Sequence, residues 1–388
     1  MKYRSTLKSK ASHFGFTNAH LGLSNNKHRL VEFIRQPQTK ARRVWARFFF
    51  VLIFVFFTNC ASPILEVPEY VSVSNEELDN LLGSYTKAYF VSHTGKDTND
   101  GSEKKPFKTI QKALDSVQAG EAVFIRDGIY NERIKIDKSG TNKQNIIISA
   151  YNNENIIIDA KNLSGLGETN SSEKINWENG VLEIRGQSNI IIHGIKIINS
   201  KSSGIYCGGV SDANGWTQIC KNIKIYRCKF ENCLAPAICF GSDFSPSENI
   251  FVIENEVINC AQVSREAISI RSVDKFEIAR NTISKVKKES IDAKAGCKNG
   301  LIHNNIISEI GYESSYPACG IYLDAWSPKI SGKENQNYSI GDGTQRNIRV
   351  YANIIKNLVH PKNEGAVQKE MGSPNYFKFT SEFKSAKI

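Results

Sequence analysis

Apolar and polar residues follow a pattern that recurs along the second half of the chain. The copies have apolar residues at the first, third and eighth positions, except that glycine opens one copy. Four of the six have asparagine at the sixth position when the third copy is aligned from Ile250. Aligned on the sixth position, successive copies are 33, 27, 26, 24 and 48 residues apart. Alternation with a period of two predicts a β-strand in every copy. The copies are "IIIHGIKI", "IKIYRCKF", "FVIENEVI", "FEIARNTI", "GLIHNNII" and "IRVYANII".

A second short strand is predicted after each of the first five copies. These strands read "GIYCGG", "AICFGS", "AISIRS", "SIDAKA" and "GIYLDA". Short strands and turns with a period of about 25 residues predict a parallel β-solenoid, in which each coil stacks on the next. Leucine-rich repeats are shorter, and propellers need four strands per repeat, so neither is expected. We expect the recurring asparagine (Asn255, Asn281, Asn305 and Asn353) to adopt the left-handed conformation and to bond its equivalent in the neighbouring coil.

An amphipathic helix is predicted before the solenoid. The segment "PFKTIQKALDSVQAG" places Ile110, Ala113, Leu114 and Val117 on one helical face, and Gly120 is expected to end the helix. The first coil of a solenoid has no preceding coil to cover it, and such a helix closes that end. The sequence therefore predicts an all-β solenoid with an N-terminal capping α-helix.

The same region carries a resemblance to a known family. The stretch "YFVSHTGKDTNDGSEKKPFKTIQKAL" resembles the opening of right-handed parallel β-helix proteins of the pectate-lyase type. The resemblance is closest to polysaccharide lyase family 9 and its uncharacterised relatives, over about residues 89–357. It implies a right-handed parallel β-helix, calcium dependence and a lysine base on the surface of the helix. The dense aspartate cluster of the well-studied members is absent from this chain.

The basic residues gather at the N-terminus. Residues 1–59 hold eleven of the 50 Lys and Arg residues and one acid, so the rest is nearly neutral and the net charge of +11 does not indicate nucleic-acid binding. Three arginines precede the apolar run "FFFVLIFVFF", which is too short to span a bilayer. Cys60 follows this run, as in a lipobox. A lipidated Cys60 would anchor a bacterial lipoprotein to the outer membrane or cell surface. Plain secretion and an uncleaved anchor are the alternatives.

Four regions are predicted along the chain. Residues 1–60 form the basic leader with a lipoprotein-type signal peptide, 61–87 a linker, 88–360 the β-helix and 361–388 an irregular tail. The tail either folds over the last coil or marks a shortened relative of longer proteins. The eight cysteines after Cys60 include no C-x-x-C pair, so we expect small buried residues and not a zinc site.

Charged residues concentrate in the second strands of three successive coils. With Ile268, Ile291 and Ile321 directed inward, alternate residues of these strands line up in outward columns. The other second strands carry little charge, so this concentration predicts a site. One column holds Ser269, Asp292 and Tyr322, the next holds Arg271, Lys294 and Asp324, and Glu266 and Glu289 stack just before them.

These residue types suit β-elimination on a polysaccharide that contains uronic acid. The reaction removes a proton next to a sugar carboxylate, so it needs a base and positive charge on that carboxylate. Burial and adjacent cations can lower the pKa of lysine, which favours Lys294 as the base, and Arg271 as a carboxylate clamp. Oxygen ligands suit Ca²⁺, and the predicted ligands are Asp292, Glu289 and Glu266.

Three further residues are predicted to bind substrate beside this patch, namely Asp324, Tyr322 and Trp326. The predicted function is an envelope-anchored, lyase-like protein that acts on an acidic, pectate-like polysaccharide with calcium. The alternative is a non-catalytic β-helix that binds glycans at the surface or serves as an adhesin. A glycoside hydrolase would need paired carboxylates without a basic partner, so the Arg271–Lys294 pair argues against it.

Overall fold

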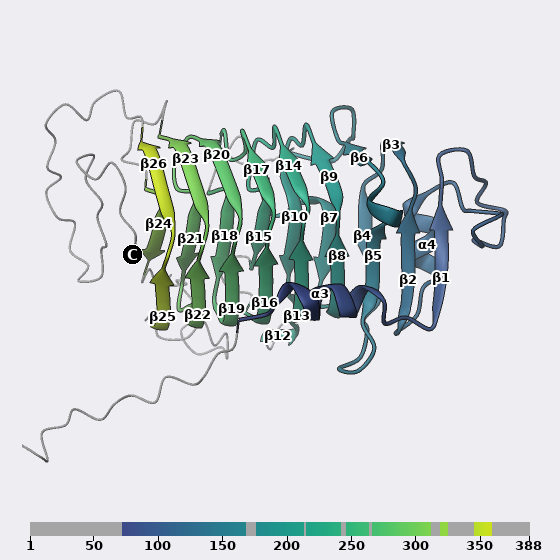
Figure 1. Ribbon diagram of the computed structural model, residues 1–388, viewed down its shortest axis with the longest axis horizontal. Helices are drawn as coiled ribbons and strands as arrows, with labels where there is room; N and C mark the ends of the chain where they lie inside the picture. Colours follow the sequence, from purple (N-terminus) through teal and green to yellow (C-terminus); the bar gives the residue numbers. More distant parts are fainter. Residues whose placement is uncertain are drawn as a thin grey trace, which may run out of the picture. The chain divides into compact units, whose positions relative to one another are not determined.

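The computed structural model describes residues 72–167, 176–212, 215–241, 246–263, 266–311, 319–324 and 345–358. They belong to one compact unit, residues 70–388. Within the described residues, strands stack coil upon coil into three parallel sheets that form a β-helix (Figure 1). Cys60, Trp326 and the predicted leader and tail lie outside the described residues.

Each sheet takes one strand from most coils. Sheet 1 contains β1 (Lys87–Val91), β2 (Glu121–Ile125), β5 (Ile146–Ala150), β8 (Ser188–His193), β13 (Cys220–Tyr226), β16 (Ser247–Ile253), β19 (Val273–Ala279), β22 (Lys298–His303) and β25 (Arg346–Tyr351). Sheet 2 contains β4 (Ile134–Ile136), β7 (Gly180–Arg185), β10 (Ser203–Gly208), β15 (Ile238–Phe240), β18 (Ile268–Arg271), β21 (Ile291–Lys294) and β24 (Ile321–Asp324). Sheet 3 contains β3 (Gly128–Tyr130), β6 (Ile156–Asp159), β9 (Ile195–Ile198), β14 (Lys229–Glu231), β17 (Glu256–Ile258), β20 (Thr282–Val286), β23 (Ile306–Ile310) and β26 (Ile354–Leu358). A short antiparallel pair, β11 (Val210–Asp212) with β12 (Gly215–Gln218), and a 3-10 turn, η1 (Tyr151–Asn153), lie outside these sheets.

The recurring pattern covers two strands, so the prediction of a single strand per copy was wrong. Each copy begins in sheet 1 and ends in sheet 3, and the predicted second strand lies in sheet 2. The corner between the two halves is a residue with positive φ, such as Arg227 (+51°), Glu254 (+56°) or Arg280 (+57°). One left-handed residue turns the chain sharply, which a period-two pattern does not reveal.

The recurring asparagine follows this corner and does not itself adopt the left-handed conformation, contrary to prediction. The predicted bonds between coils are confirmed. Asn255 Nδ2 donates to Asn281 Oδ1 at 3.0 Å, Asn281 Nδ2 to Asn305 Oδ1 at 2.9 Å, and Asn305 Nδ2 to Asn353 Oδ1 at 2.9 Å. Each Oδ1 also accepts the backbone N–H of the asparagine one coil earlier. The ladder therefore satisfies buried corner groups that the sheets leave without partners.

Helix α4 (Ile110–Ser116) covers the first coil as predicted. Ile110, Ala113 and Leu114 are buried in the main core. The helix ends at Ser116, before the predicted stop at Gly120, and Val117 follows in an extended conformation and is also buried. At the start of the helix, the Asp97 carboxylate accepts the N–H groups of Lys108 and Thr109. The Glu132 carboxylate accepts those of Ile110 and Gln111. These carboxylates satisfy amides that a helix start leaves unbonded.

The region predicted as a linker contains a second helix, α3 (Asn75–Leu82). Ser74 caps it by accepting the N–H of Glu77 at 3.1 Å. The helix lies across the outer face of sheet 1 (Figure 1), where Leu78 packs into an apolar cluster with Tyr226 and Ile253. The outer face of this sheet is apolar enough to bury a helix, so residues 72–82 are part of the folded unit.

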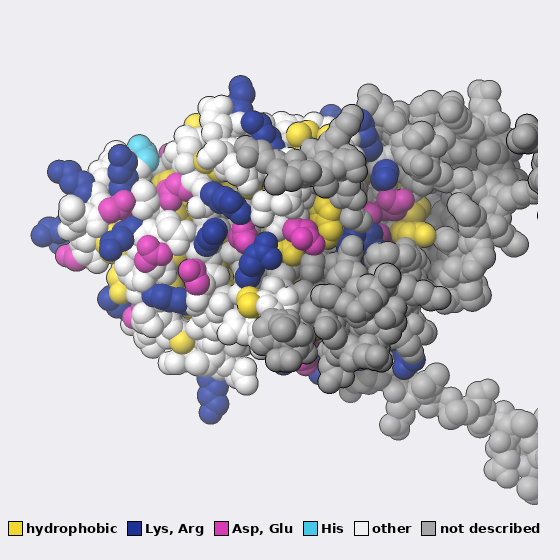
Figure 2. Space-filling view, turned by 180° about the vertical axis from the view of Figure 1, so that it is seen from behind, with side chains coloured by type: hydrophobic (Ala, Val, Ile, Leu, Met, Phe, Trp, Pro, Cys, Tyr) yellow, Lys and Arg dark blue, Asp and Glu magenta, His cyan; other side chains and the backbone are white. Residues whose placement is uncertain are grey.

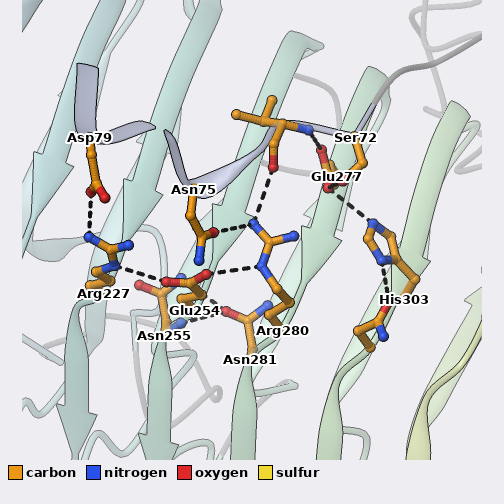
Figure 3. Close-up of polar contacts among 12 residues, drawn as sticks. Ser72, Asn75, Asp79, Arg227, Glu254, Asn255, Glu277, Arg280, Asn281 and His303 are labelled. Carbon is orange, nitrogen blue, oxygen red and sulfur yellow. Dashed lines mark hydrogen bonds and ion pairs between the residues drawn. The ribbon is translucent and has the colours of Figure 1, made fainter. Parts of the chain in front are cut away.

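Polar contacts tie the α3 segment to β19 and to the corners that follow β13 and β19 (Figure 3). Arg227 pairs with Asp79 at 2.5 Å, and Glu254 lies between Arg227 (2.9 Å) and Arg280 (3.0 Å). At the start of the segment, Glu277 accepts hydrogen bonds from the Ser72 hydroxyl at 2.6 Å and from the Val73 N–H at 3.0 Å. Hydrogen bonds from Arg227 and Arg280 hold the pKa of Glu254 below its usual range, even though burial acts to raise it.

Candidate functional site

The predicted columns of sheet 2 are confirmed by the strand register. Asp292 pairs with Ser269 on one side and Tyr322 on the other, and Lys294 pairs with Arg271 and Asp324. The first column continues through the earlier strands β15, β10 and β7, as Cys239, Tyr206 and Glu183. The sequence pattern was sufficient here because a parallel ladder keeps equivalent positions in line.

Lys294 lies at the centre of these charges. Its Nζ is 2.5 Å from Asp292 Oδ2 and 2.8 Å from Glu266 Oε1. The second oxygen of Glu266 accepts the Ser269 hydroxyl at 2.8 Å. We refer to Glu266, Arg271, Glu289, Asp292 and Lys294 as the Lys294 cluster.

Four members of the Lys294 cluster are buried and Glu289 is partly buried, which the alternation alone did not predict. Asp292 and Arg271 are each 1% exposed, Lys294 6% and Glu266 7%. The guanidinium of Arg271 lies 4.6 Å from the centre of the Trp177 ring. Positions that point outward from a strand are exposed only if nothing packs over them, and at Arg271 the Trp177 ring does so.

Burial and the carboxylates decide the protonation of the Lys294 cluster. Burial lowers the pKa of Lys294 and so does Arg271, as expected of a base, but the carboxylates of Asp292 and Glu266 outweigh them and the net pKa is raised. Burial also raises the pKa of Asp292 well above its usual range. The pKa of Glu289 is raised by burial and by neighbouring Glu266. The prediction of a lowered pKa for Lys294 was therefore wrong, because it did not include the direct ion pairs with Asp292 and Glu266.

The residues present do not fit the predicted calcium ion. Among the described residues, no group of three His, Cys, Asp or Glu side chains is arranged to hold a metal ion. The ammonium of Lys294 instead occupies the point between Asp292 and Glu266 at which a shared cation would lie. Asp292, Glu289 and Glu266 remain neighbours, as predicted, but Lys294 is the cation among them.

A second charged group lies further along sheet 2 and was missed from the sequence. Glu183 on β7 contacts Arg133 at 2.6 Å and Arg185 at 2.5 Å, and Arg185 lies 4.8 Å from the centre of the Tyr206 ring. The signal was present in "VLEIRG", which alternates charged and apolar residues as "SIDAKA" does. It was missed because β7 precedes the first recognisable copy of the repeat.

The remaining predicted positions and the two buried histidines of sheet 1 are less informative. Tyr322 is half-buried next to Asp292 in the register, and Asp324 is placed only by its pairing with Lys294. His193 and His303 are buried on sheet 1, apart from the Lys294 cluster, where His193 contacts Ser149 and His303 contacts Glu277. No disulfide joins the eight cysteines in the part of the chain that the structure describes, and seven of them are buried, as expected.

On the face shown in Figure 2, the Lys and Arg side chains of the described residues do not form a continuous basic patch. Lys and Arg side chains are interspersed there with Asp and Glu side chains. No helix among the described residues is long and apolar enough to cross a membrane.

Two family models match the chain. A Pel9A-like right-handed β-helix region matches residues 89–261, and a right-handed β-helix region matches residues 179–355. Over these residues the chain is similar to right-handed parallel β-helix proteins of the Pel9A-like, pectate-lyase type. This confirms the resemblance that the N-terminal motif and the repeats indicated, and it confirms the fold class.

Curated relatives match this β-helix protein over part of their length. It is 31% identical over 129 residues to the uncharacterized protein YwoF of Bacillus subtilis, which covers 31% of this chain and 26% of YwoF. It is 30% identical over 125 residues to pectate lyase PEL9 of Emericella nidulans, which covers 32% of this chain and 30% of PEL9. The matched region is thus less than a third of either relative.

Solved structures align with the chain at TM-scores below 0.5. The GH136 lacto-N-biosidase from Eubacterium ramulus aligns with a TM-score of 0.48 at 14% identity, over 72% of this chain and 57% of that chain. Pectate lyase Pel9A aligns with a TM-score of 0.28 at 12% identity, over 62% of this chain and 75% of that chain.

Proposed function

We propose that this β-helix protein carries out β-elimination on a uronic-acid-containing, pectate-like polysaccharide at the Lys294 cluster. The observation that carries the proposal is Lys294, fixed by Asp292 and Glu266 and next to Arg271 in the register. A pectate lyase among the relatives supports a polysaccharide as the substrate class.

Lys294 acts as the base in this proposal. Asp292 Oδ2, 2.5 Å from Nζ, is placed to take the proton that the ammonium must lose first. The neutral amine then removes the proton next to the sugar carboxylate, and the electron pair forms a carbon–carbon double bond while the bond to the departing sugar oxygen breaks. That oxygen takes up a proton from solvent. Because Arg271 is buried against Trp177, we assign it an electrostatic role beside the sugar carboxylate, instead of the direct clamp predicted from the sequence.

We also propose that the protein is exported and held at the cell envelope through a lipid on Cys60. The basic n-region, the apolar run and the cysteine that follows it support this. The test is fractionation of cells that make the full chain, together with mass spectrometry of its N-terminal peptide. Cys60→Ser is expected to release the protein from the membrane fraction. Equal membrane retention of this variant would contradict the lipid anchor.

The second candidate function is glycan binding without chemistry, as a surface protein or adhesin. It is favoured by the two ion pairs that hold Lys294 as an ammonium and by the burial of Arg271. Both candidates place an acidic polysaccharide on the outer face of sheet 2, and they differ in whether Lys294 changes its protonation.

A substrate screen with a matched variant pair tests the two functions. The full chain is incubated with pectate, alginate and glycosaminoglycans, and new double bonds are followed by ultraviolet absorbance. Lys294→Ala is expected to lower the rate by about 10²- to 10⁴-fold, as for loss of a general base. Lys298→Ala is the control, because Lys298 is half exposed and 3.6 Å from Asp274. A fully active Lys294→Ala variant would refute the base assignment, and binding without cleavage by the unaltered protein would establish the second candidate.

A further inference from the structure

We infer that Lys294 is the built-in cation of this site and that the protein engages its polysaccharide without a divalent metal ion. This deepens the proposed function, since it concerns the same cluster, but its test is separate from activity. It departs from the calcium dependence that the family resemblance implied.

The position of the ammonium carries the inference. Lys294 Nζ is 2.5 Å from an oxygen of Asp292 and 2.8 Å from an oxygen of Glu266. Calcium–oxygen distances are about 2.3–2.6 Å, so an ion bound to the same two oxygens would occupy nearly the same point as the nitrogen. The ammonium and a calcium ion therefore exclude each other at this site.

The fold keeps the ammonium in this position. Asp292 and Lys294 are two residues apart on β21, so both side chains leave the same face of the strand. The side chains are 2% and 8% exposed, and that of Glu266 is 10% exposed. A metal ion would have to displace the buried ammonium of Lys294 from both carboxylates. A calcium ion would also need about six to eight oxygen ligands.

The remaining oxygens of the cluster are a poor substitute coordination shell. Glu266 Oε2 already accepts the Ser269 hydroxyl at 2.8 Å. Among the described residues no three acidic, His or Cys side chains converge on a common point. Removing the ammonium would change this balance, because Asp292, Glu266 and the nearby Glu289 would then face one another without Lys294 among them. In the unaltered protein the ammonium of Lys294 therefore supplies the positive charge between Asp292 and Glu266 that a metal ion would otherwise supply.

Calcium titration tests the inference directly. The full chain and its Lys294→Met variant are titrated with CaCl₂ by isothermal calorimetry, and thermal unfolding is followed with CaCl₂ or EDTA. The unaltered protein is expected to bind no calcium at this site and to unfold at the same temperature in both. Lys294→Met is expected to gain calcium affinity by about tenfold or more and to be stabilised by calcium. Lys298→Met, at the exposed lysine paired with Asp274, is expected to behave as the unaltered protein.

The outcomes separate this inference from the proposed function. Binding of one calcium ion by the unaltered protein that Asp292→Asn weakens about tenfold or more would overturn the inference, whether or not the variant at Lys294 folds. A folded Lys294→Met variant without any gain in calcium affinity would also count against it. Polysaccharide cleavage that stops in EDTA would overturn the inference and leave the lyase function standing. A protein that binds no calcium and cleaves no polysaccharide would contradict the lyase function and leave the inference standing.

Discussion

The asparagine ladder makes a quantitative prediction for Asn281→Ala. Asn281 is fully buried, and its side chain accepts the backbone N–H of Asn255 at 2.9 Å and the Asn255 Nδ2 group at 3.0 Å. It also donates to the Val252 carbonyl at 2.9 Å. The substitution removes the partner of these three buried groups, while Asn305 Oδ1 keeps its bond from the Asn281 backbone N–H at 3.0 Å.

The expected loss of stability follows from that count. Each buried group without a partner costs about 1–3 kcal/mol, so three of them predict a loss of about 3–5 kcal/mol once the site relaxes. The assay is urea unfolding followed by circular dichroism, comparing midpoints at an unchanged slope. Asn142→Ala is the control, because Asn142 is exposed in a turn, and it is expected to change stability by less than about 0.5 kcal/mol. A loss below about 1 kcal/mol for Asn281→Ala would refute the view that the ladder satisfies buried corner groups.

Two further changes test the packing of sheet 1. Gly300→Ala is expected to destabilise the protein by about 1–3 kcal/mol, because a Cβ at Gly300 would lie 2.0 Å from the Phe276 ring; equal unfolding midpoints would contradict this close packing. Burial lowers the pKa of Lys224 to about 8, so stability is expected to rise between about pH 8 and 10, where the unfolded chain holds more protons than the folded one. Lys224→Met should abolish that rise and raise the melting temperature at pH 7, and an unchanged pH profile would show that Lys224 is not the group responsible.

Much of the fold was predictable because the coils of a solenoid repeat at a regular spacing along the sequence. Equivalent residues of stacked coils stand in line, so spacing alone paired Asp292 with Ser269 and Tyr322. The capping helix was visible as an apolar face at Ile110, Ala113 and Leu114. The helix α3 was missed, because its docking depends on the outer face of sheet 1, whose strands come from distant parts of the chain.

The candidate site was predicted in its membership and not in its electrostatics. The sequence placed Lys294 beside Asp292 and Arg271, and it named burial and an adjacent cation as influences on the lysine pKa. Both influences act in the predicted direction, yet the pKa is raised, because Asp292 and Glu266 lie within 2.8 Å of Nζ. Coulomb energy depends steeply on separation and local dielectric, and neither can be obtained from spacing along the chain.

The sequence by itself determined the repeat, the register of the columns and the residues that meet on sheet 2, since strand alternation and a regular period leave little freedom. The tertiary structure decided where each coil turns, which outward positions are buried, and that an ammonium lies between the two carboxylates of the site. The physical reason is that alternation fixes the side of a strand from which a side chain leaves, whereas the packing of other segments over that side fixes its solvent, its partners and its charge.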